Sequence, residues 1–311
     1  MLKIKKWLVL LLALACLGIL FACSKPGDST DKEETPDPTD TEDVAAVQAS
    51  ASLECCDGEI TLRFAKNDQD KWIWKDDETF PLDESYVAEM IATVEQMLTL
   101  TPLENPKELV DYDLDGDEEK YVVVSGKEGT ITWYLGDKND SGCYYMRRAD
   151  QEGLVYLAPA QLTEQISLSI YDMAVLPELP TLTEESLISL RITDDQEQEI
   201  TIAADASGNW MDNQGTDRSV TTAVLLRAFA QPKVAACVDY RPATGAATIC
   251  GLKNPQATLH VEYINSLDGQ ATLTIYVGKE WKGGYYAKVN NDSTIYLLPA
   301  ELVEPILSFI D

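Results

Sequence analysis

Residues 130–136 read TITWYLG, and residues 272–278 read TLTIYVG. Two more matching pairs follow in the same order: GCYY from 142 with GGYY from 283, and YLAPAQL from 156 with YLLPAEL from 296. The offset between the copies falls from 142 to 141 to 140, so each intervening loop loses one residue, as loops tolerate. Order, spacing and residue type together predict an internal duplication that decides the fold.

Periodicity within the first copy predicts its strands and helices. Apolar and polar residues alternate over residues 60–64, as on a half-buried strand, and residues 72–74 (WIW) are its expected hairpin partner. Apolar residues recur at helical spacing over residues 83–98, which predicts a helix. The remaining expected elements are two hairpins, over residues 121–135 and 143–157, and a helix that begins at Pro159.

The second copy is expected to repeat this order. Trp210 precedes a helical stretch over residues 219–230, and residues 181–186 form a predicted linker between the copies. Short turns between neighbouring strands favour antiparallel sheets with helices on one face. The sequence therefore predicts an α+β fold of two similar tandem modules, residues 53–176 and 186–311, each a mainly antiparallel sheet with two helices.

Residues 1–22 have the parts of a secretory signal peptide. Lys3, Lys5 and Lys6 form a basic start without an acid, and an apolar run follows over residues 7–22. This run of about 16 residues is shorter than the roughly 20 that a membrane-spanning helix needs. The start of the chain therefore predicts export.

Residues 20–23 (LFAC) resemble the lipobox of bacterial lipoproteins. In such proteins the cysteine thiol receives diacylglycerol and becomes the new N-terminus after cleavage. The resemblance implies that Cys23 carries fatty-acyl chains such as palmitate, which hold the protein on the extracytoplasmic face of the cell membrane. An uncleaved signal anchor is the alternative. Residues 23–52, acidic and containing three prolines, are expected to form a disordered tether.

The formal net charge of the chain is −29, and the predicted signal peptide removes three lysines and no acid. Nucleic acids and anionic lipid headgroups bind basic surfaces, so neither is an expected partner. The oxidising side of a membrane allows a disulfide between Cys237 and Cys250, and free buried thiols are the alternative. No cysteine or histidine spacing predicts a metal site, and no cofactor is expected.

Four short segments resemble the DUF4340 family: residues 252–255 (LKNP), 277–278 (VG), 284–287 (GYYA) and 295–298 (IYLL). Both copies are similar to it, so the resemblance covers most of the chain after residue 53. The family has no assigned activity, so it carries over no catalytic residue. Its members are often exported or membrane-attached, and some accompany ABC-type transport systems. The resemblance therefore implies an ABC transporter permease or another envelope protein as the partner.

Residues 111–117 (DYDLDGD) imitate the start of an EF-hand loop. A calcium loop needs a bidentate glutamate at position 12, where this chain has Val122. The second copy has residues 250–255 (CGLKNP) at the same point, without a carboxylate. We therefore interpret the segment as a solvated acidic turn, and calcium is the alternative. The candidate ligands are Asp111, Asp113, Asp115 and Asp117.

Aromatic residues on the predicted strands are candidates for a ligand surface. Adjacent strand residues point to opposite faces, so one ring of each tyrosine pair is expected in the core and the other partly exposed. The outward rings suit a sugar or a peptide, whereas packing within the sheet is the simpler interpretation. The candidates are Tyr144, Tyr145, Trp281, Tyr285 and Tyr286.

The sequence favours a non-enzymatic, lipid-anchored module that binds another envelope component. A solute- or glycan-binding lipoprotein is the second hypothesis. A hydrolase of unrecognised type is the third, although His260, the one histidine of the chain, has no nucleophile motif near it.

Overall fold

The computed structural model describes residues 38–116, 119–267 and 269–310. Residues Thr39–Asp311 form one compact unit. We refer to residues 38–176 as the first half and to residues 177–310 as the second half.

Several expectations lie outside the described residues. These are the signal peptide over residues 1–22, the lipidation site Cys23 and the tether up to residue 37. In the part of the chain that the structure describes, no helix combines the length and apolar character needed to cross a membrane.

The first half contains a seven-stranded sheet with antiparallel pairing throughout. Its strands are β1 (Ser50–Asp57), β2 (Thr61–Lys66), β3 (Trp72–Trp74), β4 (Lys120–Gly126), β5 (Gly129–Lys138), β6 (Tyr144–Arg148) and β7 (Tyr156–Leu157). Their order is β3-β2-β1-β4-β5-β6-β7. Its helices are α2 (Pro38–Gln48), α3 (Glu84–Met97) and α4 (Ala160–Ile166), with 3-10 turns η1 (Leu109–Tyr112) and η2 (Ile170–Met173).

The second half contains an eight-stranded antiparallel sheet. Its strands are β8 (Leu187–Asp194), β9 (Glu199–Ala204), β10 (Trp210–Asp212), β11 (Ala236–Asp239), β12 (Ala257–Ile264), β13 (Gln270–Trp281), β14 (Gly284–Val289) and β15 (Ile295–Pro299). Their order is β10-β9-β8-β12-β13-β14-β15-β11, so without β11 it repeats that of the first sheet. Its helices are α5 (Ser219–Ala228), α6 (Ala246–Ile249) and α7 (Ala300–Leu307).

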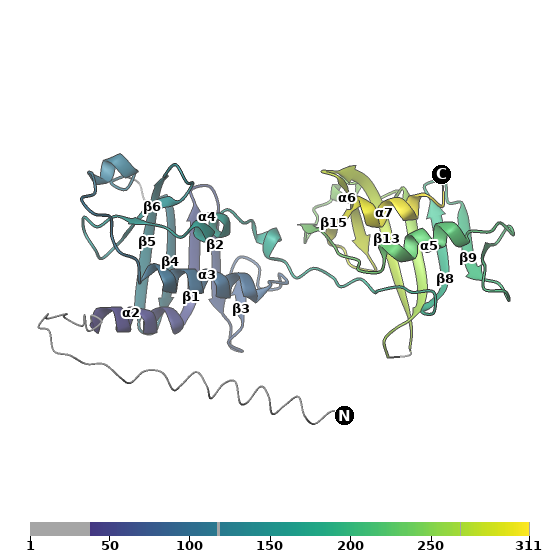
Figure 1. The fold of residues 1–311 in the computed structure, drawn as a ribbon, viewed down its shortest axis with the longest axis horizontal. Coiled ribbons are helices and arrows are strands. Elements are labelled where there is room, and N and C mark those ends of the chain that lie inside the picture. Colours follow the sequence, from purple (N-terminus) through teal and green to yellow (C-terminus); the bar gives the residue numbers. More distant parts are fainter. Residues whose placement is uncertain (1–37, 117–118, 268, 311) are drawn as a thin grey trace, which may run out of the picture. The chain divides into compact units, whose positions relative to one another are not determined.

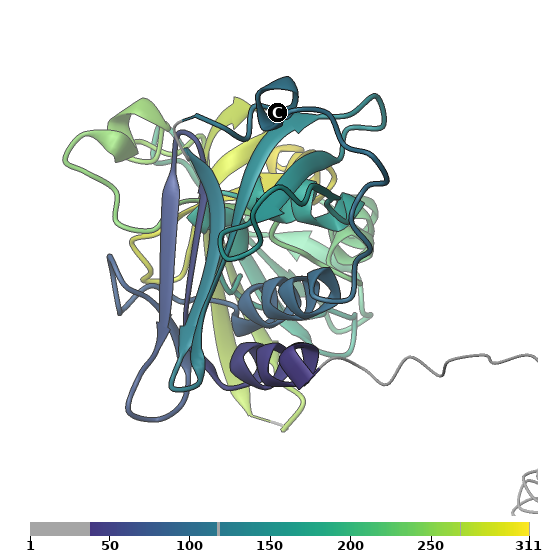
Figure 2. The same ribbon diagram turned by 90° about the vertical axis from the view of Figure 1, so that its left-hand side faces the viewer.

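Helices cover one face of each sheet. Figures 1 and 2 show α2 and α3 lying side by side on the same face of the first sheet, and α5 and α7 lie together on the second. Helix α3 begins where the sequence predicts, because Asp83 Oδ1 accepts a hydrogen bond from Ser85 N–H at 3.0 Å. The mixed fold of mostly antiparallel sheets with few helices is thus confirmed.

Local details recur at equivalent places in the two sheets. Trp72 N–H donates to the side chain of Glu84, the first residue of α3, at 2.7 Å. In the same way, Trp210 N–H donates to the side chain of Ser219, the first residue of α5, at 3.0 Å. The pairing of β5 with β6 shifts register between Leu135 and Lys138, and that of β13 with β14 shifts at the equivalent point.

A close-packed glycine also recurs. A Cβ on Gly136 would collide with the carbonyl oxygen of Tyr112, and a Cβ on Gly278 would collide with that of Cys250. In each loop, the residue after this carbonyl has a positive φ. It is Asp113, after Tyr112, in the first half and Gly251, after Cys250, in the second. In both halves, therefore, a loop crosses the sheet at a position where only glycine leaves enough room.

The predicted tether ends earlier than expected. Helix α2 and the first residues of β1 occupy positions 38–52, which the acidic composition assigned to disorder. Ala46 and Val47 are buried in the first core, and Asp43 pairs with the buried Arg148 at 2.7 Å. These contacts explain why this acidic stretch is ordered.

Strand β1 itself was missed by the sequence pattern, although it lies at the centre of the first sheet and pairs with both β2 and β4. Its sequence, SASLECCD, does not alternate cleanly, and the adjacent Cys55 and Cys56 are both buried. Ile60, expected on a half-buried strand, is 53% exposed and precedes β2.

Candidate functional site

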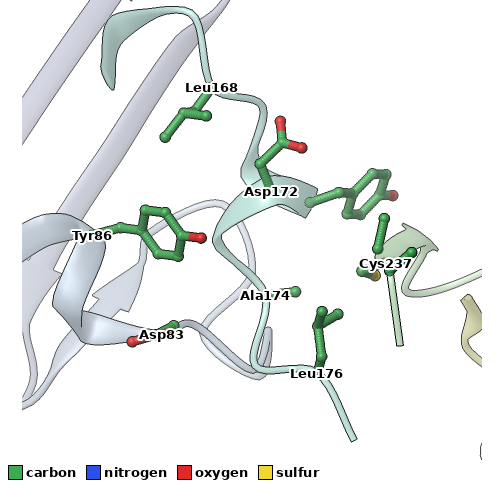
Figure 3. A pocket seen from close by; sticks show the side chains of 10 residues that line it. Asp83, Tyr86, Leu168, Asp172, Ala174, Leu176 and Cys237 are labelled. Carbon is green, nitrogen blue, oxygen red and sulfur yellow. The ribbon is translucent and has the colours of Figure 1, made fainter. Parts of the chain in front are cut away.

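A hollow of about 490 Å³ lies among α3, η2, the segment after η2, and β11. Figure 3 shows Tyr86 extending from α3 towards the segment that carries Asp172 and Ala174, while Cys237 approaches from β11. Its volume is within the range typical of ligand sites. Leu168 and Leu176 contribute apolar wall.

Backbone hydrogen bonds hold the walls of the hollow together. Asp83 N–H donates to Met173 O at 2.8 Å, and Val175 N–H donates to Pro81 O at 2.7 Å. Leu82 and Ala174 form an isolated antiparallel bridge between these segments. The start of α3 and the segment after η2 therefore move as one piece.

A cluster of three aromatic side chains packs beside the hollow. The ring centroid of Phe80 lies 5.3 Å from that of Tyr240 and 6.2 Å from that of Tyr171. Tyr240 Oη donates to Thr79 O at 2.7 Å, and Arg241 Nη1 lies 2.9 Å from Asp77 Oδ2. Phe80 is a residue of the first half, but its side chain packs in the hydrophobic core of the second half.

Two carboxylates line the hollow, and none of the described residues that line it is basic. Asp83 uses one oxygen to cap α3. Asp172 uses Oδ2 to accept hydrogen bonds from Ser169 N–H at 2.8 Å and Ser169 Oγ at 2.7 Å. Each carboxylate thus uses one oxygen in a local hydrogen bond, and both residues contribute negative charge to the lining of the hollow.

Two other titratable residues that line the hollow, Tyr171 and Cys237, have raised pKa values. Burial, with the carboxylates of Asp239 and Asp292 nearby, raises the pKa of the Cys237 thiol to about 11. The thiol is therefore protonated at neutral pH and is a poor nucleophile. Burial and Asp239 also raise the pKa of Tyr171, so its hydroxyl stays available as a donor.

The aromatic candidates do not form one surface. Tyr144 is buried, whereas Tyr145 is partly exposed and packs on Tyr112 with ring centroids 4.6 Å apart. Tyr285 is partly buried against the core of the second half. Packing within the protein therefore accounts for these three rings.

Trp281 and Tyr286 do come together, at the turn between β13 and β14. Their rings stack with centroids 5.2 Å apart, and Lys282 Nζ lies 4.4 Å from the Trp281 ring centroid. Lys282 and Gly283 both have positive φ, as a tight hairpin turn requires. A sugar that stacked on the free face of Trp281 would have to displace Lys282.

The acidic loop is partly described. Asp111 lies in η1, and Asp113, in the left-handed region, has Oδ2 4.0 Å from Lys120 Nζ. Asp117 lies outside the described residues, and Asp115 is exposed. Among the residues described, no group of three or more acidic, cysteine or histidine side chains has the arrangement of a metal site.

His260 and the cysteines have structural surroundings. His260 Nδ1 lies 3.0 Å from Thr274 Oγ1, and its neighbours Leu259 and Val261 are buried on the opposite face, as predicted. Of the two alternatives for Cys237 and Cys250, the structure has the free buried thiols.

Sequence reasoning placed Asp83 only at the start of the predicted helix over residues 83–98 and missed the hollow. Tyr86, Asp172 and Cys237 come from separate segments and carry no motif. The one available signal was the position of Asp83 at a predicted helix start, which gives no hint of a cavity.

This architecture defines an α+β protein with two mostly antiparallel sheets and few helices. Residues 72–249, more than half of the chain, match the family model described as Domain of unknown function (DUF4340), and the chain belongs to that family. The match is one stretch from β3 to α6, so it runs from the first half into the second. No curated protein and no solved structure matches the chain significantly.

Proposed function

We propose that this chain is an extracytoplasmic lipoprotein, anchored to the cell membrane through Cys23, that binds another envelope protein. The signal-like start and the lipobox-like LFAC segment support the anchor. The resemblance to DUF4340 suggests an ABC transporter permease as the partner. The observation that carries the binding role is the acidic hollow beside α3, η2 and β11.

The two halves are, in this proposal, two tandem copies of one module. Their shared strand order, equivalent register shifts and equivalent glycine crossings support a duplication. A duplicated module gives a second surface that is free to diverge while the first keeps its original contacts.

The hollow suits a lysine or arginine side chain of the partner. Asp83 and Asp172 supply negative charge, and Tyr86 supplies a hydroxyl. Leu168 and Leu176 give apolar wall for the methylene stem of a long basic side chain. The net charge of −29 attracts a basic partner over longer range and raises its rate of association.

The anchor would keep this site close to the bilayer. Fourteen residues separate Cys23 from Pro38, where α2 begins. Even a fully extended chain of that length spans at most about 50 Å. The binding site would therefore meet a membrane protein more readily than one free in solution.

Site-specific photo-crosslinking in intact cells tests this function. A photoreactive residue at Ala235, an exposed position that lines the hollow, should yield a discrete adduct with one envelope protein. The same residue at the exposed Ala204 of β9 is the control and should not. Asp172→Asn keeps an oxygen for Ser169 but removes the charge, and should abolish the adduct. Equal crosslinking from both positions would reject the proposal.

A glycan-binding role is the second candidate, favoured by the partly exposed stack of Trp281 on Tyr286. A bound oligosaccharide would raise the melting temperature by mass action. A screen of cell-wall oligosaccharides by thermal shift tests it, with Trp281→Ala as the variant that must lose any shift.

A further inference from the structure

Helix α5 presents apolar side chains to solvent. Val220 is 81% exposed and Val224, one turn later, is 42% exposed. Val224 borders a groove of about 540 Å³ between α5 and α7, in which Ala228 and Pro305 add apolar surface, and Val220 lies one turn before Val224 on the same helix. Figure 1 shows the two helices side by side on the second sheet. Contiguous apolar patches on a protein surface often mark interaction sites, which makes this face a candidate for docking.

The equivalent surface of the first half is polar and closed. Glu84 and Ser219 both begin their helices and bind the preceding tryptophan, so Val220 and Val224 correspond to Ser85 and Glu89. Both residues of α3 are exposed and polar.

In the first half, the gap between the helices is bridged as well. Gln161 Nε2 of α4 donates to Thr93 Oγ1 of α3 at 2.6 Å, and Thr93 is fully buried. The residue that corresponds to Thr93 on α5 is Ala228, which lines the groove. The fold therefore requires neither the exposed valines nor the open groove, which are particular to the second half.

The charges beside the groove make it self-complementary. Arg227 lines it from α5 and Glu301 lines it from α7. When two identical grooves meet across a two-fold axis, each arginine can face the glutamate of the other copy while the valine stripes pack together. A different partner would have to carry an apolar stripe flanked by one positive and one negative charge. A second copy of this chain already carries all three.

We propose that this groove pairs with the same groove of a second copy of the chain. The occupant is thus another molecule of the same protein, independently of the acidic hollow and its partner. Two chains of charge −29 repel each other, so the apolar contact must overcome a repulsion that salt screens. The dimer should therefore tighten as salt rises, unlike a complex held mainly by charge.

Sedimentation velocity of the native protein, purified from membranes in nonionic detergent, tests the pairing. We expect a monomer–dimer equilibrium that is several-fold tighter in about 500 mM than in about 50 mM sodium chloride, because the Debye length shortens. Val220→Ser with Val224→Glu, the residues of the first half, should weaken the dimer at least about tenfold, or 1.4 kcal/mol. Ile249→Ser, which alters another exposed apolar residue, is the matched control and should leave it unchanged.

A mixing experiment identifies the contact. Arg227→Glu and Glu301→Arg should each be monomeric alone, and a mixture of the two should form a heterodimer, because the altered charges become complementary only between molecules. Circular dichroism confirms that each variant is folded. A native chain that stays monomeric in both salts, or valine variants that dimerise like the native chain, would overturn the proposal.

Discussion

The two halves of this molecule share several buried contacts and differ at other buried positions and at their surfaces. Both have the same strand order, the same tryptophan-to-helix hydrogen bond and the same glycine crossing. The first half adds α2, and the second adds β11 and the open groove between α5 and α7. The two sheets thus meet the same steric demands at these positions, whereas their added elements and helix surfaces differ.

Single equivalent positions show how the additions are accommodated. Arg148 pairs across from Trp133 and binds Asp43 of α2, whereas the equivalent residue of β14, Val289, is apolar and buried. Among the described residues between η2 and β8, no helix corresponds to α2. The buried charge of Arg148 therefore occurs in the half that has a helix, α2, whose Asp43 neutralises it.

The largest expected effect tests the shared glycine crossing. Gly136→Ala and Gly278→Ala each place a Cβ against a backbone carbonyl oxygen that cannot move without shifting a loop. We expect each to lower the free energy of unfolding by about 3 kcal/mol, at the upper end for overpacking. Urea unfolding monitored by circular dichroism measures this.

Gly116→Ala is the matched control, because its added Cβ would meet nothing within 4 Å. It should change stability by less than about 0.5 kcal/mol, as surface substitutions do. If one crossing glycine tolerated alanine and the other did not, the two loops would not be equivalent.

The next effect tests the addition of α2. Arg148→Val, which installs the residue of the second half, leaves the partly buried carboxylate of Asp43 without its partner. We expect a loss of about 2 kcal/mol, less than for a fully buried pair, with faster amide exchange in α2. Asp150→Asn alters the exposed partner and should cost under about 1 kcal/mol. Unchanged exchange in α2 would show that Arg148 does not fasten the helix.

A smaller expected effect is a difference between the halves in how a tyrosine hydrogen bond stabilises the fold as pH changes. Tyr296 Oη donates to Asp292 Oδ2 at 2.6 Å, whereas the equivalent Tyr156 donates to the neutral Gln151 at 2.6 Å. Burial alone would raise the pKa of Asp292, but hydrogen bonds from Tyr296 and Thr294 outweigh it and lower the pKa.

Because the folded pKa is lowered, this contribution is present above the ordinary aspartate pKa and fades as pH falls through the folded value. Asp292→Asn should therefore destabilise the protein at pH 7 by less than about 1 kcal/mol, since the carboxylate is exposed to solvent. The difference should vanish in strong acid, as measured by urea unfolding across pH. Gln151→Ala should show a loss that does not depend on pH, and a pH-dependent loss there would contradict the assignment.

The smallest expected effect concerns which cysteine thiols a reagent can modify in the native protein. Cys143 is partly exposed, and its equivalent Gly284 could not carry a side chain because its Cβ would meet Leu298 O. The other described cysteines are buried, and burial raises the pKa of Cys55 to about 12. A thiol reagent at pH 8 should modify Cys143 in the native protein and the others only after denaturation. Rapid native labelling of Cys55 would show that the first sheet opens readily.

The hairpins were predictable because turn glycines and alternating apolar residues are local signals. Helix α3 was predicted from the spacing of its apolar residues alone, and the structure adds the capping hydrogen bond of Asp83. Strand β1 was not, because a central strand owes its conformation to neighbours such as β4, distant in sequence. The hollow escaped for the same reason, since Asp83, Asp172 and Cys237 meet only after folding.

Mass spectrometry of the native protein, purified from membranes of the source cells, tests the anchored role most directly. The account predicts a mature N-terminal peptide that begins at Cys23 and carries the added mass of a diacylglyceryl group, with residues 1–22 absent. Recovery of a chain that retains Met1 and an unmodified Cys23 thiol would contradict it.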